Sequence, residues 1–321
     1  MTARSTHFTG VKNPSTRLIQ AVLVTLLCSS TAPGQKPPIT DIAFAPNGDS
    51  IACCSQTGMQ ILDWPNLNLV KQVDVSFPNL HCVTFSPDGE KLAVAGGYPS
   101  EEGIVQIFSW PDCVMQTQYS GHDDSVVALN WQGRSQLISA SLDRTLKRWN
   151  LTTRKPVLTY HGHSRGLRSV RTLRTGELVT AGNDHSVRVW QSETGSMIRT
   201  LNQHTKPISA ISVCPISTGR PMIATAAGDR TIRFWQPTIG RMMRYVRLES
   251  EPLDICWIHE NLLAASCEDG RLRIIDTEHV KVLKSIPALT GWAYAIAAHP
   301  TDGTLAIAGS NGQILRVHVP R

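Results

Sequence analysis

Apolar residues along most of the chain occur in short runs that are separated by turn-forming residues. Between residues 166 and 201, apolar or alternating segments cover 166–173, 177–181, 186–190 and 196–201, with Gly, Asn, Asp and Thr between them. Runs of about four to eight residues with this alternation are typical of short antiparallel strands, and are too short for most helices. The pattern therefore predicts an all-β protein built from units of four strands.

The same order of strands and turns recurs along the chain at intervals of roughly 40 residues. Copies begin near Thr40, Leu80, Ser125, Gly166, Pro207, Pro252 and Trp292. A single four-stranded unit cannot bury both of its faces, whereas units arranged in a ring bury each face against a neighbour. The seven copies therefore predict a seven-bladed β-propeller of four-stranded antiparallel blades.

Three of the copies share a fixed frame of polar residues. In segments 137–149, 178–190 and 223–235, an Asp stands six residues before a Trp and four residues after a Ser or Thr, and a His lies upstream. The sets are His122, Ser139, Asp143 and Trp149; His163, Thr180, Asp184 and Trp190; and His204, Thr225, Asp229 and Trp235.

This recurring frame resembles that of the WD-repeat (WD40-type) β-propeller family, and the resemblance extends from about Ile39 to the end of the chain. The Asp that usually follows the Trp in this family is absent, since Asn150, Gln191 and Gln236 stand there. The resemblance implies that each set forms a chain of hydrogen bonds from indole to hydroxyl to imidazole to carboxylate. Such a chain would satisfy every buried polar group in it.

The other copies depart from the frame. The sixth copy keeps Asp269 but has Ala265 and Ile275 in place of the hydroxyl and the Trp, and the seventh has Ile307, Asn311 and Val317 at the three positions. We expect these two blades to depend on apolar packing alone. The seventh copy also ends after its third predicted strand, residues 313–319, so its blade has three strands unless an upstream segment completes it.

The first 34 residues have the layout of a secretory signal. A polar, basic stretch precedes the apolar run Leu18–Cys28, and small residues follow at 29–34. The run is too short to span a bilayer comfortably. We expect residues 1–34 to be a signal peptide, 35–321 to be the propeller, and the mature protein to be periplasmic or extracellular. The alternative is a cytoplasmic protein in which residues 22–27 remain and form a strand that closes the last blade.

The charge of the chain does not indicate nucleic-acid binding. The net charge is +6 over 321 residues, but residues 1–34 hold three basic residues and no acidic one, which leaves 28 Lys and Arg against 25 Asp and Glu, or +3. The remaining basic residues are scattered, and no run of them forms the patch that nucleic-acid binding requires.

The eight cysteines contain no Cys-x-x-Cys pair, which argues against a zinc site, and most lie in apolar runs typical of buried strands. His161 with His163, and Asp123 with Asp124, give no full set of metal ligands. We therefore expect no metal and no cofactor.

Two patterns could suggest an enzyme. Ser139, His122 and Asp143 have the residue types of a hydrolase triad, and residues 162–166 fit Gly-x-Ser-x-Gly. The triad residue types occur in three copies, however, whereas an enzyme needs one site, and the segment after Gly166 is predicted to be a strand instead of the helix that a nucleophile elbow requires. We therefore expect no catalytic residues.

The function expected from these features is a protein-interaction scaffold, because propeller loops can vary while the blades stay rigid. The candidate partner-binding residues lie in loops beside the repeated Asp and His: Asp123, Asp124, Arg144, Arg165, His185, Lys206 and Arg230. Each of them taken alone could be an ordinary solvated loop charge. The alternative function is an exported enzyme or ligand binder that uses the central channel of the propeller.

Overall fold

The computed structural model describes residues 36–153, 155–215 and 219–319, which form seven antiparallel sheets, here called blades 1 to 7. Blade 1 contains β1 (Ile39–Phe44), β2 (Ser50–Ser55), β3 (Gly58–Asp63) and β4 (Leu69–Val73); blade 2 contains β5 (Cys82–Phe85), β6 (Lys91–Tyr98), β7 (Glu102–Ser109) and β8 (Met115–His122); blade 3 contains β9 (Val126–Gln132), β10 (Gln136–Ser141), β11 (Leu146–Asn150) and β12 (Lys155–Tyr160). Blade 4 contains β13 (Leu167–Thr172), β14 (Leu178–Gly182), β15 (Val187–Trp190) and β16 (Met197–Leu201).

The remaining blades follow in the same order. Blade 5 contains β17 (Ile208–Val213), β18 (Ile223–Ala227), β19 (Thr231–Gln236) and β20 (Arg241–Arg247); blade 6 contains β21 (Pro252–His259), β22 (Leu262–Cys267), β23 (Arg271–Asp276) and β24 (Lys281–Pro287). Blade 7 contains β25 (Ala295–Ala298), β26 (Thr304–Ala308) and β27 (Ile314–His318), with a short 3₁₀ turn, η1 (Ser310–Gly312), before β27.

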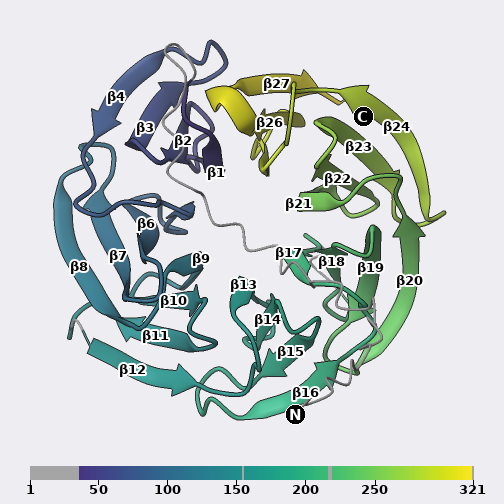
Figure 1. Ribbon diagram of the computed structural model, residues 1–321, viewed down its shortest axis with the longest axis horizontal. Helices are drawn as coiled ribbons and strands as arrows, with labels where there is room; N and C mark the ends of the chain where they lie inside the picture. Colours follow the sequence, from purple (N-terminus) through teal and green to yellow (C-terminus); the bar gives the residue numbers. More distant parts are fainter. Residues whose placement is uncertain (1–35, 154, 216–218, 320–321) are drawn as a thin grey trace, which may run out of the picture. The chain divides into compact units, whose positions relative to one another are not determined.

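The blades stand side by side in a ring with the first strand of each blade innermost (Figure 1). Each innermost strand contacts the innermost strand of the next blade, and β25 contacts β1 to close the ring. The predicted seven-bladed propeller is therefore confirmed, with three described strands in the last blade, while residues 22–27, the alternative closing strand, lie outside the described residues. The four strands expected between residues 166 and 201 agree with β13–β16 to within one residue at each end.

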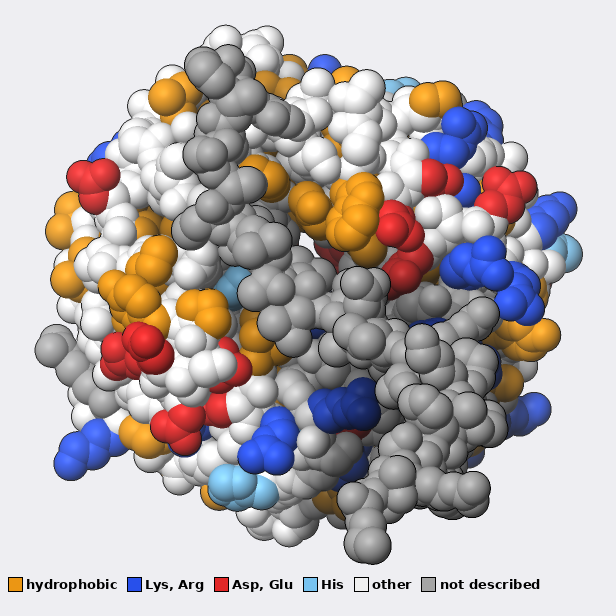
Figure 2. Space-filling view, in the orientation of Figure 1, with side chains coloured by type: hydrophobic (Ala, Val, Ile, Leu, Met, Phe, Trp, Pro, Cys, Tyr) orange, Lys and Arg blue, Asp and Glu red, His pale blue; other side chains and the backbone are white. Residues whose placement is uncertain are grey.

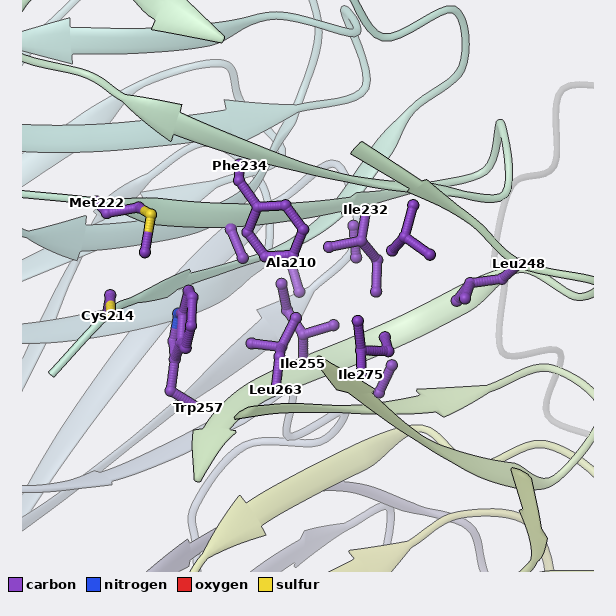
Figure 3. Packing of buried hydrophobic residues seen from close by; sticks show 14 of the residues in the cluster. Ala210, Cys214, Met222, Ile232, Phe234, Leu248, Ile255, Trp257, Leu263 and Ile275 are labelled. Carbon is purple, nitrogen blue, oxygen red and sulfur yellow. The ribbon is translucent and has the colours of Figure 1, made fainter. Parts of the chain in front are cut away.

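The core is divided among the seams between neighbouring blades, as expected for sheets that cannot bury their faces alone. At the seam of blades 5 and 6, Phe234 and Ile232 from β19 face Ile255 and Trp257 from β21, and all of them are buried (Figure 3). Such apolar packing supplies most of the stabilising free energy of the blades.

The seam that closes the ring is built in the same way. Ile39, Ile42 and Ile51 of blade 1 pack with small residues of blade 7, among them Ala306. The amide of Ile39 also donates a hydrogen bond to the carbonyl oxygen of Gly309, 3.1 Å away. A Cβ atom on Gly309 would lie 2.0 Å from the carbonyl oxygen of Trp292, so only glycine allows the chain to pass so closely here.

Two carboxylates on the innermost strands link neighbouring blades. Asp41 accepts hydrogen bonds from its neighbour Ile42 (2.8 Å) and from Val83 of blade 2 (2.9 Å). Asp254 bonds in the same way to the amide of Ile296 in blade 7, at 3.1 Å. Burial in the ring raises the pKa of Asp41 to about 7 although the two amides oppose the shift. The sequence patterns did not single out either residue.

The predicted signal peptide, residues 1–34, lies outside the described residues, as does Cys28. The other seven cysteines form no disulfide with one another, and all except the half-buried Cys256 are buried. Across the described parts of the chain, we find no helix with the length and apolar character needed to cross a membrane.

Candidate functional site

The repeated polar residues meet inside blades 3, 4 and 5. In blade 4, the indole nitrogen of Trp190 donates to the hydroxyl of Thr180 at 2.8 Å, and this hydroxyl lies 2.7 Å from His163 Nε2. His163 Nδ1 lies 2.9 Å from Asp184 Oδ2. β14 and β15 thus hold the hydroxyl and the indole, while the loop that enters the blade supplies the imidazole.

The other two sets have nearly the same geometry. In blade 3 the three successive distances, from Trp149 through Ser139 and His122 to Asp143, are 2.8, 2.7 and 2.7 Å. In blade 5 they are 2.8, 2.8 and 2.9 Å, from Trp235 through Thr225 and His204 to Asp229. The structure thus brings together all twelve residues of the three sets, and we call each set a tetrad.

Each tetrad Asp also fixes the backbone around it. Oδ2 of Asp184 accepts the amide of Ser164 at 3.1 Å, and Oδ1 accepts the hydroxyl of Ser186 at 2.8 Å. In blade 3, burial alone would raise the pKa of Asp143, but hydrogen bonds from His122 and Thr145, with the electrostatic attraction of His122, lower the pKa to about 2. The pKa values of all three tetrad carboxylates are lowered, so the carboxylates are ionised, and their oxygens accept hydrogen bonds from within the fold.

The three tetrad hydroxyls are not accessible to a substrate. Ser139, Thr180 and Thr225 are each 0% exposed, and each hydroxyl accepts a hydrogen bond from an indole while facing an imidazole. The segment after Gly166 is the strand β13, as predicted, so the Gly-x-Ser-x-Gly match has no nucleophile-elbow geometry. The resemblance to a hydrolase triad is therefore one of residue types alone.

Blade 6 corrects the expectation that it depends on apolar packing alone. Arg273, only 2% exposed, donates from Nη1 and Nη2 to the two oxygens of Asp269, at 2.9 and 2.7 Å. The prediction failed because the partner of Asp269 is a residue outside the Ser/Thr and Trp positions of the repeat. Blade 7 has a different pair, in the turn between β25 and β26, where His299 Nδ1 lies 3.0 Å from Asp302 Oδ1, and its Ile307 is buried in the core.

The candidate partner-binding residues all lie at one end of the blades, in the loops between blades and in the turns between second and third strands. We call this end the loop face. Arg144, His185 and Arg230 each follow a tetrad Asp and have positive φ angles of 74°, 65° and 60°. Asp123, Asp124, Arg165 and Lys206 lie in the loops before β9, β13 and β17.

Asp124 differs from the other candidates because the fold uses its carboxylate. Oδ1 accepts the amide of Ser100 at 2.9 Å and the amide of Ser125 at 2.7 Å. It therefore fastens the turn between β6 and β7 to the loop that enters blade 3. Asp123, Arg144, Arg165, Lys206 and Arg230 are exposed, and His185 is half-buried.

The sequence patterns missed one part of the loop face. β6 and β7 each contain eight residues, more than their counterparts in the other blades, and their hairpin carries the exposed Tyr98 and Glu101. Beside it, an open pocket of about 520 Å³ is also lined by Glu102, Ser120 and Asp123. The Glu101–Glu102 pair between two long apolar strands was the available signal in the sequence. Within the described residues, no group of three His, Cys, Asp or Glu side chains could hold a metal ion.

Comparison with protein families gives four matches to one model, described as "WD domain, G-beta repeat", at residues 26–59, 113–150, 154–191 and 195–236. The last two matches run from the outer strand region of one blade through the third strand of the next, so each repeat joins two blades. The three tetrads lie within the last three matches.

Curated proteins with significant similarity include three eukaryotic relatives. The UBP9-binding protein bun62 of Schizosaccharomyces pombe is 27% identical over 36% of this chain and 22% of its own length. WD repeat-containing protein 1 of Xenopus tropicalis is 35% identical over 26% of this chain and 14% of its own length. The cell division cycle protein cdt2 of S. pombe is 26% identical over 40% of this chain and 27% of its own length. The similarity thus spans no more than 27% of any of these relatives.

Proposed function

The chain belongs to the WD-repeat β-propeller proteins, and from this premise we propose that it is a non-catalytic scaffold that binds other proteins through its loop face. WD40 propellers generally bind other proteins, and one relative is by its printed name a UBP9-binding protein. Because the similarity covers small parts of these relatives, their partners are not assigned to this chain.

The observation that supports this proposal most strongly is a contrast between two sets of polar side chains near the loop face: one set is buried and bonded to itself, and the other is exposed and unpaired. The tetrad residues satisfy one another and are buried, so they serve the fold. By contrast, Arg144, Arg165, Lys206 and Arg230 are exposed and form no ion pair with a described carboxylate. A rigid ring that presents unpaired charges from successive loops is suited to binding a partner surface.

The proposal can be tested by affinity capture from the native source with the wild-type protein and a loop-face variant. The variant carries Glu101→Gln, Asp123→Asn, Arg144→Asn, Arg165→Gln, Lys206→Gln and Arg230→Asn. Asn is chosen at Arg144 and Arg230 because it tolerates positive φ angles. We expect the wild type to capture specific proteins and the variant to lose them, as measured by quantitative mass spectrometry.

A matched control changes the same number of charges of each sign at the opposite end of the blades, where the first-to-second and third-to-fourth strand turns lie. Its substitutions are Asp112→Asn, Glu278→Gln, Lys155→Gln, Arg174→Gln, Arg241→Gln and Lys281→Gln, all at exposed positions. The control should retain the partners. Capture of every partner by the loop-face variant would contradict the proposed binding face.

Export also remains a proposal, supported by the layout of residues 1–34. The mass of the protein purified from its native source tests it directly. A mass that includes residues 1–34 would contradict cleavage of a signal peptide.

A further inference from the structure

The loop face carries a cationic region over three consecutive blades. The turns of blades 3, 4 and 5 place Arg144, His185 and Arg230 at equivalent positions, each directly after a tetrad Asp and each with positive φ. The loops that enter blades 4 and 5 add Arg165 and Lys206, both exposed. We call these five residues the cationic sector.

The Lys and Arg side chains of this sector are free to bind, whereas other arginines of the same blades are not. Arg148 pairs with Glu193 at 2.9 Å, and Arg188 and Arg233 lie 3.6 and 3.8 Å from their tetrad carboxylates. For Arg144, Arg165, Lys206 and Arg230, the described residues provide no such ion pair. Within the described residues, therefore, no ion pair neutralises these four exposed charges, and only Lys206 has a carboxylate, Glu251, near enough to interact at longer range.

Carboxylates bound the cationic sector on both sides. Glu101 and Asp123 lie on the side of blades 2 and 3, and Glu249, Glu251 and Glu268 lie on the side of blade 6. Lys206 is near enough to Glu251 to lower its pKa, although burial raises that pKa overall. Figure 2 shows basic side chains at the bottom of the ring with acidic ones to their left, whereas the two kinds lie side by side at the upper right. The sector can therefore accept only a short stretch of negative charge.

We propose that the cationic sector binds a short acidic segment, rich in Asp and Glu, of a partner protein. This inference rests on the proposed scaffold function and specifies its partner. Arginines at the sector can form paired hydrogen bonds with carboxylates, and complementary charge increases the rate and specificity of association. A nucleic acid fits less well, because its continuous phosphate charge would meet the flanking carboxylates after a few nucleotides.

The test measures binding of a fluorescent peptide of about eight consecutive glutamates to the full chain by fluorescence anisotropy. Matched probes are the same peptide with glutamines and a single-stranded oligothymidylate of about 20 nucleotides. We expect the glutamate peptide to bind most tightly and its affinity to fall as salt is raised from about 50 to about 300 mM. Absence of binding, or tighter binding of the oligothymidylate, would overturn the proposal.

Two variants locate the binding. A cationic-sector variant carries Arg144→Asn, Arg165→Gln, Lys206→Gln and Arg230→Asn, and a control carries Lys155→Gln, Arg174→Gln, Arg241→Gln and Lys281→Gln. Both lose the same formal charge. The sector variant should lower the affinity for the glutamate peptide by about tenfold or more, and the control by less than about twofold. Equal losses would overturn the proposal, because they would show a response to net charge alone.

The same two variants in the affinity capture separate this inference from the proposed function. Loss of partners by the sector variant supports both the scaffold function and the acidic-segment proposal. Partners that are retained by the sector variant but lost by the full loop-face variant contradict the acidic-segment proposal and leave the scaffold function in place. If the full loop-face variant also retains every partner, the proposed binding face fails as well.

Discussion

Blades 4 and 6 place an Asp at the same turn but surround it differently. The side chain of Asp184 in blade 4 is 4% exposed and bonds to His163, and Arg188 Nη2 lies 3.6 Å from Asp184 Oδ2. The side chain of Asp269 in blade 6 is 33% exposed and bonds to Arg273, which is buried. Arg188 and Arg273 both stand four residues after their Asp, on the third strand of the blade.

The difference follows from the three positions that hold the hydroxyl, the indole and the imidazole in blade 4. Arg188 lies opposite Thr180 in the strand register, whereas Arg273 lies opposite Ala265. Where blade 4 has the buried indole of Trp190, blade 6 has Ile275. Without an imidazole, a hydroxyl or an indole to satisfy, the interior of blade 6 has space for the guanidinium, and Asp269 satisfies its charge. One scaffold thus accepts two different polar cores.

The largest effect should come from removing the tetrad indole, in whose place blade 6 has Ile275. Trp190→Ala should lower the free energy of unfolding by about 3–5 kcal/mol, because it leaves a cavity and removes a donor to Thr180. Urea denaturation followed by circular dichroism measures the loss. Ile275→Ala in blade 6 is the control, and should cost about 2–3 kcal/mol because it removes volume but no hydrogen bond. A loss below about 1 kcal/mol for Trp190→Ala would contradict a core role for the tetrad.

In blade 6 the next largest effect should come from separating the buried pair. Asp269→Ala leaves the guanidinium of Arg273 buried without its carboxylate, and should cost about 2 kcal/mol, discounted for the partial exposure of Asp269. Adding Arg273→Leu should restore stability to within about 1 kcal/mol of the wild type, because both charges are then gone. Denaturant melts of the two single variants and the double variant measure this coupling. Additive losses would show that the pair does not stabilise the blade as a unit.

The sequence predicted those features that depend on local spacing. The strands, the turns and the blade number follow from apolar periodicity, and the tetrad residues occur at fixed offsets that a linear frame can detect. The Arg273–Asp269 pair could not be predicted in this way, since it depends on how much space the absence of a Trp and a Thr leaves. The bonds of Asp41 and Asp254 cross between blades, and depend on a ring register that no single repeat encodes.

The two polar cores should also differ in their response to pH. Burial lowers the pKa of His163 below the ordinary value of 6.5, although Asp184 opposes the shift. The unfolded chain then binds more protons just below pH 6.5, so this contribution to stability is present above pH 6.5 and lost as the pH falls. The pKa of Asp269 is lowered from 3.8 by its bonds to Arg273, so its contribution is lost only below about pH 4.

Melts of the wild type and His163→Gln between pH 8 and pH 4.5 test this difference. The wild type should lose more stability than the variant as the pH falls below 6.5, because the variant lacks the titrating imidazole. Comparison with the variant cancels the contribution of Asp41, whose raised pKa acts in the opposite direction. Asp269→Asn should leave the slope in this range unchanged. Parallel curves for the wild type and His163→Gln would contradict the prediction.

The smallest effect is expected at Glu249, which occupies the loop position of the missing histidine. His204 and Glu249 each precede a proline by three residues, yet the side chain of Glu249 is 92% exposed. Its carboxylate lies 3.6 Å from Nη2 of Arg273, and because Glu249 is so exposed, solvent screens most of the attraction between the two charges. Glu249→Gln should therefore change the free energy of unfolding by less than about 0.5 kcal/mol in a urea melt. A loss comparable to that of Asp269→Ala would mean that Glu249 substitutes for the imidazole, and that the two polar cores differ less than the burial of their residues indicates.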